Sequence, residues 1–543
     1  MFRTTIRPIA LATIGAIAIP LTACSTVDSP TNESAASVPS TRSTVVVASG
    51  ESEPSCLDPH VGGNWPQALI GTQVLESLFS RDSDGNVIPW LAEKAEESDD
   101  GMTVTVFLKE GITFSDGTPF NADAVVANVE HLRNPETKSS TGVLALAKVA
   151  QAVAVDEHTV RFEMNEPDSA LPASLAQTWL AMMSPAGLER GFEANCAEPI
   201  GTGPFTFESW TKQDRVVLKK NPTFVDADEV AIEEIQWRFV PDASARVAAL
   251  RSGEADLIDQ VQPLDLKQLD ASGEGVMVLG PRPGTTARIE LNTTAPVFND
   301  ERVREAFALS ANIDEGVENL FGGIITRSTS PLASTLPERH EFPDAFPYDP
   351  QRAAQLLDDA GWSERDENGT RMKDGQALTV RFPISTNQSI PAEISLVEQI
   401  ASGASEVGFK VMIEPLDISN WYQRAGEWSF DAIIAPYSKS SADVLRIVYH
   451  SDGNIPAPSG YHANNTGLEL PDLDALVDEA GRSADAQTRR ELYAQAQQMI
   501  IDSHAVIPLY DQTGMFARSP QLEGFTLREN LYIPDFTGAK ITQ

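Results

Sequence analysis

The sequence predicts an α/β protein made of two lobes. Segments that alternate polar with apolar residues, as strands do, are followed repeatedly by segments with an apolar stripe at helical spacing. The chain has 543 residues. Because a single hydrophobic core usually stops growing at about 250 to 300 residues, we expect two cores and therefore two lobes.

The clearest elements lie between Leu91 and Leu132. The segment Thr103–Leu108 has the period-2 pattern of a half-buried strand, and the turn dipeptide Asp100-Gly101 before it predicts a hairpin. Asn121 is a suitable N-cap for a helix that should stop at Asn134-Pro135. The apolar residues that share one face of this helix are Val125, Val126, Val129 and Leu132.

The same patterns predict the remaining elements. Strands are expected at residues 45–47, 159–164, 205–210, 216–219, 235–240, 288–293, 378–382, 410–414, 430–435 and 506–510. Helices are expected at residues 67–78, 243–252, 394–407, 471–481 and 485–502. Asp300 and Asp349 should cap two more helices, the second of which begins at Pro350 and ends at Gly361.

Residues 1–23 have the features of a lipoprotein signal peptide. Arg3 and Arg7 precede an apolar segment at residues 9–20 that is too short to cross a bilayer comfortably. Leu21-Thr22-Ala23-Cys24 follows and resembles a bacterial lipobox, in which cleavage before Cys24 frees a thiol that carries a lipid. The alternative is ordinary secretion with cleavage elsewhere. No other apolar run approaches membrane-spanning length, so we expect a protein anchored to the outer face of the cytoplasmic membrane.

The three cysteines fit this location. Residues 24–44 are rich in Ser, Thr, Pro and Asn, which predicts a disordered tether between lipid and folded protein. With Cys24 lipidated, Cys56 and Cys196 remain as an even pair in an oxidising compartment. We expect them to form a disulfide, with two buried free thiols as the alternative.

Charge and motifs exclude several classes of function. The formal net charge is −38, from 78 acidic and 40 basic side chains, and no stretch is rich in Lys and Arg, so a nucleic-acid partner is not expected. Zinc-protease, paired-cysteine, nucleophile-elbow and phosphate-loop motifs are missing, which predicts a protein that is not an enzyme. A hydrolase built from distant residues remains the alternative. His450 and His462 lie in a Gly/Pro/Asn-rich stretch and offer a weaker indication of a metal or metal chelate.

The segment from Leu91 to Leu132 resembles the signature of the bacterial family 5 extracellular solute-binding proteins. In that family a Leu-Ala pair leads through a strand, an Asp-Gly turn and a second strand to Gly-(apolar)-x-Phe-x-Asp-Gly and a helix. Here these positions are Leu91-Ala92, Asp100-Gly101, Val104–Lys109, Gly111–Gly117 and Asn121–Leu132. The tryptophan usual near the start is replaced by Ala95.

Further motifs extend the resemblance from Val45 to about Tyr510. Leu57-Asp58-Pro59 and Asn299–Phe307 match family segments, and Gly201–Phe205 matches Gly-Thr-Gly-Pro-(aromatic). A phosphate cradle would need a helix after these glycines, whereas a strand is expected here, so we interpret the motif as a tight entry into a strand.

The resemblance implies a two-lobed periplasmic-binding-protein-like fold with hinge strands and a ligand cleft between the lobes. The implied first lobe spans residues 45–287, with an inserted subdomain at about 95–200. The second lobe spans residues 288–510, and residues 511–543 return to the first lobe. The strands at 288–293 and 506–510 are those that cross between lobes in the family.

The implied function is that of a lipid-anchored, monomeric receptor for an ABC importer. It would capture a peptide or peptide-like solute and deliver it to the permease and ATPase subunits, with no cofactor. Binding would favour the closed state through contacts to both lobes. A nickel or other metal chelate, or another non-peptide solute, is the alternative ligand; a surface enzyme and a structural lipoprotein are alternatives of other classes.

The resemblance also indicates ligand-binding residues. Asn64 and Trp65 lie in the loop that faces the ligand in the family, and Trp421 and Tyr422 follow a helix start that resembles one next to the cleft. Peptide-binding members carry a tryptophan and, three residues later, an aspartate that pairs with the peptide ammonium. These positions are Tyr437 and Ser440 here, and Asp443 is a possible substitute. The alternative for Trp421 and Tyr422 is a role in the core, because neighbours on a helix point in different directions.

Overall fold

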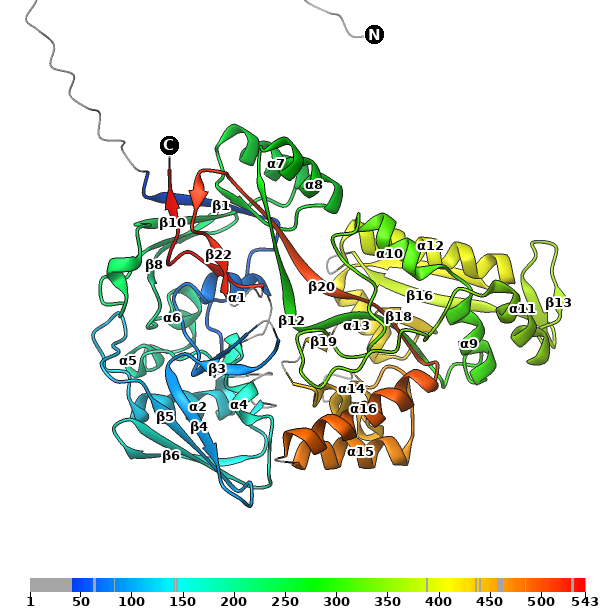
Figure 1. Cartoon of the computed structure of the whole chain (residues 1–543), viewed down its shortest axis with the longest axis horizontal. Helices are drawn as coiled ribbons and strands as arrows, with labels where there is room; N and C mark the ends of the chain where they lie inside the picture. The colour runs from blue at the N-terminus through cyan, green and yellow to red at the C-terminus, as the bar shows by residue number, and fades with distance from the viewer. Residues whose placement is uncertain are drawn as a thin grey trace, which may run out of the picture. The chain divides into compact units, whose positions relative to one another are not determined.

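The structure is a computed structural model of the chain, drawn in Figure 1. It describes residues 42–61, 65–82, 84–137, 139, 142, 145–386, 389–434, 437–438, 441–456, 462–483, 485–528 and 532–542. The N-terminal predictions, including Cys24 and the tether, therefore lie outside the described residues. Within the part of the chain that is described, no helix combines the length and the apolar character needed to cross a membrane.

The largest of the described sheets has nine strands. Its order is β18-β12-β20-β11-β1-β10-β9-β8, with β19 paired to β12. Among the described strand pairs of this sheet, β1 pairs in parallel with β10 and β11, and the others are antiparallel. The strands are β1 (Thr44–Ser49), β8 (Phe205–Thr211), β9 (Arg215–Lys220), β10 (Glu234–Phe239), β11 (Leu257–Ile258), β12 (Val276–Leu291), β18 (Ala432–Ile434), β19 (Tyr437–Ser438) and β20 (Val506–Arg518).

The antiparallel strands β12 and β20 run between two hydrophobic cores (Figure 1). One core takes residues from 45–257 and 516–541, and the other takes residues from 287–510. The pairing of β12 with β20 shifts register between Pro281 and Thr286, where Gly284 has a positive φ of 64°. Both strands are longer than the segments 288–293 and 506–510 expected from the sequence, because the ladder continues on the other side of this shift.

A four-stranded antiparallel sheet and helix α2 form a third core, which contains the strand, hairpin and helix expected at 91–132. The sheet order is β4-β5-β7-β6, with strands β4 (Ala92–Glu97), β5 (Thr103–Leu108), β6 (Val149–Asp156) and β7 (Thr159–Met164). Helix α2 (Ala122–Arg133) begins after the N-cap Asn121, whose side chain accepts a hydrogen bond from the Ala124 amide, and ends at Asn134. This core takes its buried residues from Leu78 to Met182.

The predicted helix at 67–78 is wrong in its C-terminal half. Helix α1 (Trp65–Gly71) ends at Gly71, and the following backbone pairs with other segments instead. The Val74 carbonyl accepts from the Gly203 amide at 2.9 Å, and the Glu76 carbonyl accepts from the Met182 amide at 2.8 Å. Gly201 and Gly203 press against the Val74 carbonyl with no room for a Cβ atom, and β8 follows them. The Gly-Thr-Gly motif is therefore a tight entry into a strand, as interpreted from the sequence.

The second core is an α/β layer. Strands β16 (Thr379–Ser385) and β17 (Lys410–Leu416) pair in parallel, joined by α12 (Pro391–Val407). Helices α9 (Glu301–Leu309) and α11 (Pro350–Asp359) start at the expected N-caps, since the Asp300 side chain accepts from the Arg302 amide and that of Asp349 from the Arg352 amide. The other helices of this half are α10 (Ile313–Leu320) and α13 (Ile418–Gly426).

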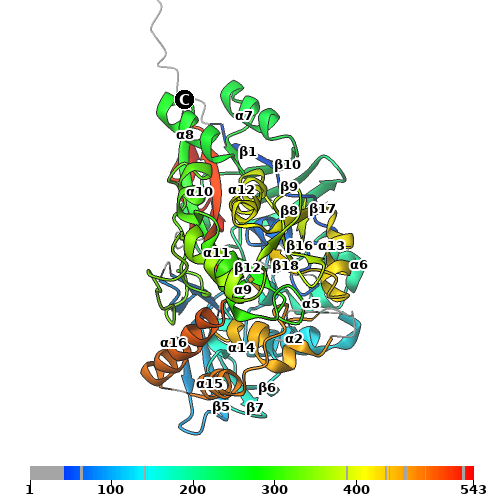
Figure 2. The same ribbon diagram turned by 90° about the vertical axis from the view of Figure 1, so that its right-hand side faces the viewer.

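A helical cluster packs beside that layer. Helices α14 (Val444–Tyr449), α15 (Pro471–Arg482) and α16 (Ala486–Asp502) share one core, and α15 and α16 lie side by side (Figure 2). Helix α16 matches the helix expected at 485–502, with Asp485 as its N-cap.

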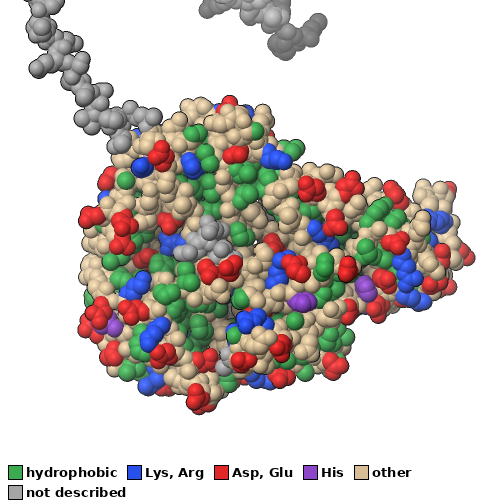
Figure 3. All heavy atoms as spheres, viewed as in Figure 1, with side chains coloured by type: hydrophobic (Ala, Val, Ile, Leu, Met, Phe, Trp, Pro, Cys, Tyr) green, Lys and Arg blue, Asp and Glu red, His purple; other side chains and the backbone are tan. Residues whose placement is uncertain are grey.

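The remaining elements are short. They are α4 (Leu171–Ser174), α5 (Pro185–Leu188), α6 (Phe192–Ala197), α7 (Ala243–Ser252), α8 (Pro263–Ser272), β2 (Phe79–Arg81), β3 (Val87–Pro89), β13 (Glu364–Arg365), β14 (Arg371–Lys373), β15 (Gln376–Ala377), β21 (Leu522–Glu523), β22 (Thr526–Leu527), β23 (Pro534–Asp535) and β24 (Lys540–Ile541). Acidic side chains are scattered over the face drawn in Figure 3, where Lys and Arg do not gather into one patch.

Candidate functional site

Trp65, the first residue of α1, lies in an aromatic cluster. Its half-buried ring meets Trp179 and Tyr532 edge-on, with ring centroids 5.6 and 5.3 Å away. The Arg282 guanidinium lies 4.6 Å from the Tyr532 centroid and 5.8 Å from that of Trp65. Such edge-on and cation–π contacts fix ring orientation. The neighbouring Asn64 lies outside the described residues.

Glu51 joins Arg282 to Tyr532. One carboxylate oxygen, Oε1, accepts from Arg282 Nη2 at 3.0 Å and from the Tyr532 hydroxyl at 2.9 Å. Burial raises the pKa of Tyr532 well above its usual value, and the Glu51 charge adds to this, so the hydroxyl stays protonated and donates.

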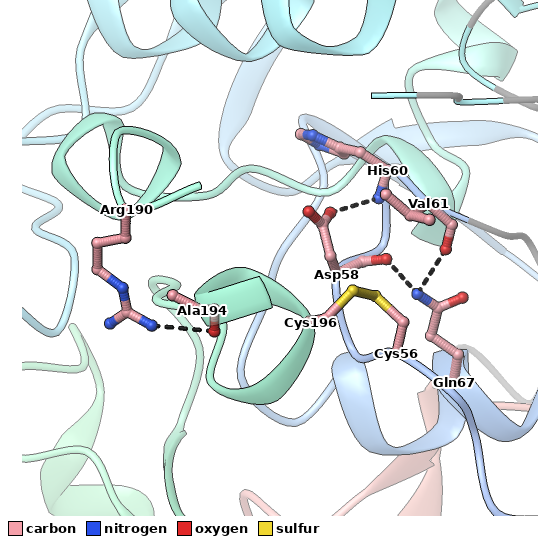
Figure 4. The surroundings of a disulfide bond; sticks show 8 residues. All are labelled: Cys56, Asp58, His60, Val61, Gln67, Arg190, Ala194 and Cys196. Atoms are coloured by element: carbon pink, nitrogen blue, oxygen red, sulfur yellow. Dashed lines mark hydrogen bonds between the residues drawn. A yellow bond between two sulfur atoms is a disulfide. The ribbon is translucent and has the colours of Figure 1, made fainter. Parts of the chain in front are cut away.

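A disulfide between Cys56 and Cys196 anchors the chain that leads to Trp65 (Figure 4). It links this segment to α6, and the Leu57 amide donates to the Cys196 carbonyl at 2.8 Å. The Gln67 side-chain amide donates to the carbonyls of Asp58 and Val61, so the segment is also held to α1. The expected disulfide is therefore present in the structure.

His60 of this segment is buried and contacts the half-buried His131. His60 Nε2 is 2.9 Å from the Ala181 carbonyl and must donate to it, so the neutral His60 ring accepts at Nδ1 from His131 Nδ1, also at 2.9 Å. Burial lowers the pKa of His60 to about 4.

We expect this pair to weaken the fold in acid. In the unfolded chain His60 binds a proton below its ordinary pKa of 6.5, whereas in the folded protein it stays neutral down to about pH 4. The free energy of unfolding therefore decreases as the pH falls from 6.5 to about 4. The loss from His60 alone between pH 7.5 and pH 5 is about 2 kcal/mol. Urea unfolding at both pH values should show this difference between the wild type and His60→Asn. The exposed His340, changed to Asn, is the control, and an equal pH dependence in all three proteins would contradict the expectation.

Trp421 and Tyr422 take different environments in α13. Trp421 is 3% exposed and packs with Ala425, Phe430 and Ile433, whereas Tyr422 is 48% exposed. Their rings touch edge-on at 5.1 Å. The packing alternative thus accounts for Trp421, and Tyr422 is the one of the two that offers surface to a ligand.

Asp443 precedes α14 with an unsatisfied carboxylate oxygen. Its Oδ1 is buried and accepts no hydrogen bond from the described residues. The carboxylate does not cap α14 and lies near Gly481. Its charge acts on Asp168, whose pKa is raised first by burial. The adjacent Ser169 hydroxyl donates to the Gly481 carbonyl at 3.4 Å.

The other predicted residues are only partly described. Tyr437 pairs through its backbone with Thr286 of β12, its side chain is not described, and Ser440 lies outside the described residues. His462 Nδ1 lies 2.8 Å from the Asn454 carbonyl, and His450 accepts from the Asp452 amide. Among the described residues, no three potential ligands of His, Cys, Asp or Glu type converge as a metal site would require.

The described candidate residues come from both halves of the chain. The structure gathers Trp65 with Trp179, Tyr532 and Arg282, three partners that the sequence analysis missed. Asp443 lies close enough to Asp168 for its charge to act on that carboxyl group. No local sequence pattern indicates that Tyr532 contacts Trp65, because Tyr532 lies in a segment of short strands near the C-terminus.

Comparison with known proteins shows which family this chain resembles. The family model of the bacterial extracellular solute-binding proteins, family 5, matches residues 86–456. The glutathione-binding protein GsiB of Salmonella typhi is 29% identical over 498 residues, covering 89% of this chain and 91% of that protein.

Solved structures share the fold. NikA of Brucella suis, in complex with Fe(III)-EDTA, superposes with a TM-score of 0.81 at 25% identity, covering 92% of this chain and 100% of NikA. DppA of Helicobacter pylori, in complex with the peptide STSA, gives a TM-score of 0.74 at 20% identity, covering 92% of this chain and 98% of DppA. The two-lobed α/β fold expected from the sequence is confirmed.

Proposed function

Because this chain belongs to the bacterial extracellular solute-binding proteins of family 5, we propose that it captures a peptide-like solute and delivers it to the permease and ATPase of an ABC importer. The family consists of substrate-binding components of importers and is not a family of enzymes. The observation that carries the proposal is the family match together with the similarity to glutathione-binding proteins along 89% of the chain.

We propose that the lobes divide where the cores divide. The first lobe is residues 45–287, with its subdomain at about 95–200, the second is residues 288–510, and residues 511–543 return to the first. The core residues at 45–257 and 516–541 on one side and 287–510 on the other support these bounds. Strands β12 and β20 are then the hinge, and ligand that touches both lobes stabilises the closed state of a monomer.

The proposed ligand contacts come from both lobes. Asn64 and Trp65 belong to the first lobe. The second lobe contributes Tyr422, Tyr437, Ser440 and Asp443. The buried Trp421 packs edge-on against the Tyr422 ring and so helps to position it. Asp443 is the proposed partner of a ligand ammonium, because its buried Oδ1 accepts no hydrogen bond from the described part of the chain.

Ligand identification tests the function directly. Native mass spectrometry of the purified protein should show a bound solute of peptide-like mass, and calorimetry should show saturable binding of glutathione or short peptides. Failure of glutathione, its disulfide and a library of di- to nonapeptides to bind would overturn the proposal.

A metal chelate is the second candidate, and the similarity to NikA with Fe(III)-EDTA favours it. Calorimetry with the nickel–histidine complex separates the two. Binding of this chelate with no binding of glutathione or peptides would replace the peptide-like ligand by a chelate.

We propose a lipid anchor at Cys24, since the thiol ends a lipobox. Cys24→Ser should release the protein into the culture medium of the producing cell, whereas the wild type should stay with the membrane fraction. Immunoblots of the two fractions measure this, with the wild-type protein as the reference. Membrane retention of Cys24→Ser would contradict the anchor.

A further inference from the structure

Four residues form a connected group where β12 meets the first core. We call Trp65, Tyr532, Arg282 and Glu51 the hinge-side cluster. Arg282 follows Pro281, the residue at which the pairing with β20 shifts register. The Tyr532 amide donates to the Pro281 carbonyl at 3.1 Å, so the C-terminal segment is tied to the crossing strand at the same point.

The ring of Tyr532 lies directly on β20. Gly514 pairs with Gly280 across the two crossing strands, and a Cβ atom at Gly514 would collide with the Tyr532 ring. Tyr532 is 1% exposed. Its ring orientation is therefore set by the backbone of the crossing and by the hydroxyl bond to Glu51.

Arg282 interacts with two acidic side chains. Its guanidinium donates to Glu51 at 3.0 Å. Its charge also acts on Glu393 of α12, which is 3% exposed and accepts from the Tyr510 hydroxyl at 2.5 Å. Burial raises the pKa of Glu393, and hydrogen bonds from Ser389 and Tyr510 and the charge of Arg282 oppose this.

We propose that Arg282 and Tyr532 are positioning residues for ligand capture, which hold the Trp65 ring in one orientation and tie it to the β12–β20 crossing. This inference rests on the proposed function in one respect, namely that Trp65 contacts the ligand. A half-buried ring fixed before binding loses less side-chain freedom when the ligand arrives. Movement of the crossing strands is then transmitted to the ring that touches the ligand.

The variants separate the effect of the Tyr532 ring from that of its hydrogen bond to Glu51. Tyr532→Phe keeps the ring but removes the hydroxyl bond to Glu51, and Arg282→Met removes the guanidinium. Arg282→Lys restores the charge without the planar fork and should rescue partly. Tyr449→Phe is the matched control, because it removes another buried hydroxyl bond to a glutamate, 3.2 Å long, in the second half of the chain.

Two readouts are needed. The first is the ¹⁹F NMR line of Trp65 in protein labelled with 5-fluorotryptophan, assigned with Trp65→Phe. The second is the Kd of glutathione by calorimetry. Tyr532→Phe and Arg282→Met should move or broaden the Trp65 line and weaken glutathione binding by about 2- to 10-fold, the effect of one newly mobile side chain. Tyr449→Phe should change neither.

The outcomes are distinguishable. A Trp65 line identical to that of the wild type in both variants overturns the inference, as does a moved line with unchanged glutathione affinity. If the wild type binds neither glutathione, nor its disulfide, nor the peptides, the proposed ligand class fails, and the ¹⁹F line still decides whether Arg282 and Tyr532 hold the ring. If Arg282→Met does not fold, Tyr532→Phe carries the test alone.

Discussion

Replacing both Cys56 and Cys196 by alanine is expected to lower the free energy of unfolding by about 5 kcal/mol. The two cysteines are 140 residues apart, and in the chain-entropy model a cross-link across a loop of this length removes about this much conformational freedom from the unfolded chain. The contacts around the disulfide remain in the variant, since the Leu57 amide still reaches the Cys196 carbonyl.

Urea unfolding measures this loss. The double variant should also show a larger m-value, because its unfolded chain is less compact. Wild-type protein unfolded in the presence of a reductant should match the double variant, and this comparison controls for the volume lost on changing two sulfurs to hydrogens. A loss below about 1 kcal/mol with an unchanged m-value would contradict the entropic account.

Local chemistry made much of the fold predictable. Asn121, Asp300 and Asp349 cap helices as their sequence positions indicate, because an N-cap needs only an acceptor and the amides two or three residues ahead. The predicted strand at 103–108 matches β5 to the residue, since strict alternation of polar and apolar residues leaves one register that buries the apolar face.

Where the prediction fails, distant segments compete for the backbone. The apolar spacing from residue 67 to residue 78 suits a helix, but the carbonyls of Gln73, Val74 and Glu76 bond to amides of Phe205, Gly203 and Met182, more than 100 positions away. The lengths of the crossing strands β12 and β20 were underestimated for a similar reason. Gly280 and Gly514 weaken the strand pattern in each sequence alone, yet they pair with each other and make room for Tyr532.

The site was predictable only where a motif marks it. The family motif indicates Trp65, but its partners Trp179, Arg282 and Tyr532 come from three segments without a shared pattern. For Trp421 and Tyr422 the sequence left contact and packing open, because successive helical residues differ by about 100° in direction. The structure buries the first and exposes the second.

Asp443→Asn is expected to weaken the binding of a ligand that carries a free ammonium by about 2 to 5 kcal/mol. The Asp443 Oδ1 atom is buried and accepts no hydrogen bond from the described residues. An ammonium would satisfy this oxygen, whereas asparagine carries no negative charge to pair with an ammonium.

The probe pair for this test is glutathione and its N-acetylated form, in which a neutral acetamide replaces the ammonium. Wild-type protein should prefer glutathione in calorimetry, and Asp443→Asn should bind both forms about equally, because the preference resides in the charge pair. Asp452→Asn, which changes an acidic residue that is 69% exposed in its side chain, is the matched control and should keep the preference. If Asp443→Asn retains the wild-type preference for glutathione, Asp443 does not hold the ammonium. The ammonium is then recognised by a residue other than Asp443.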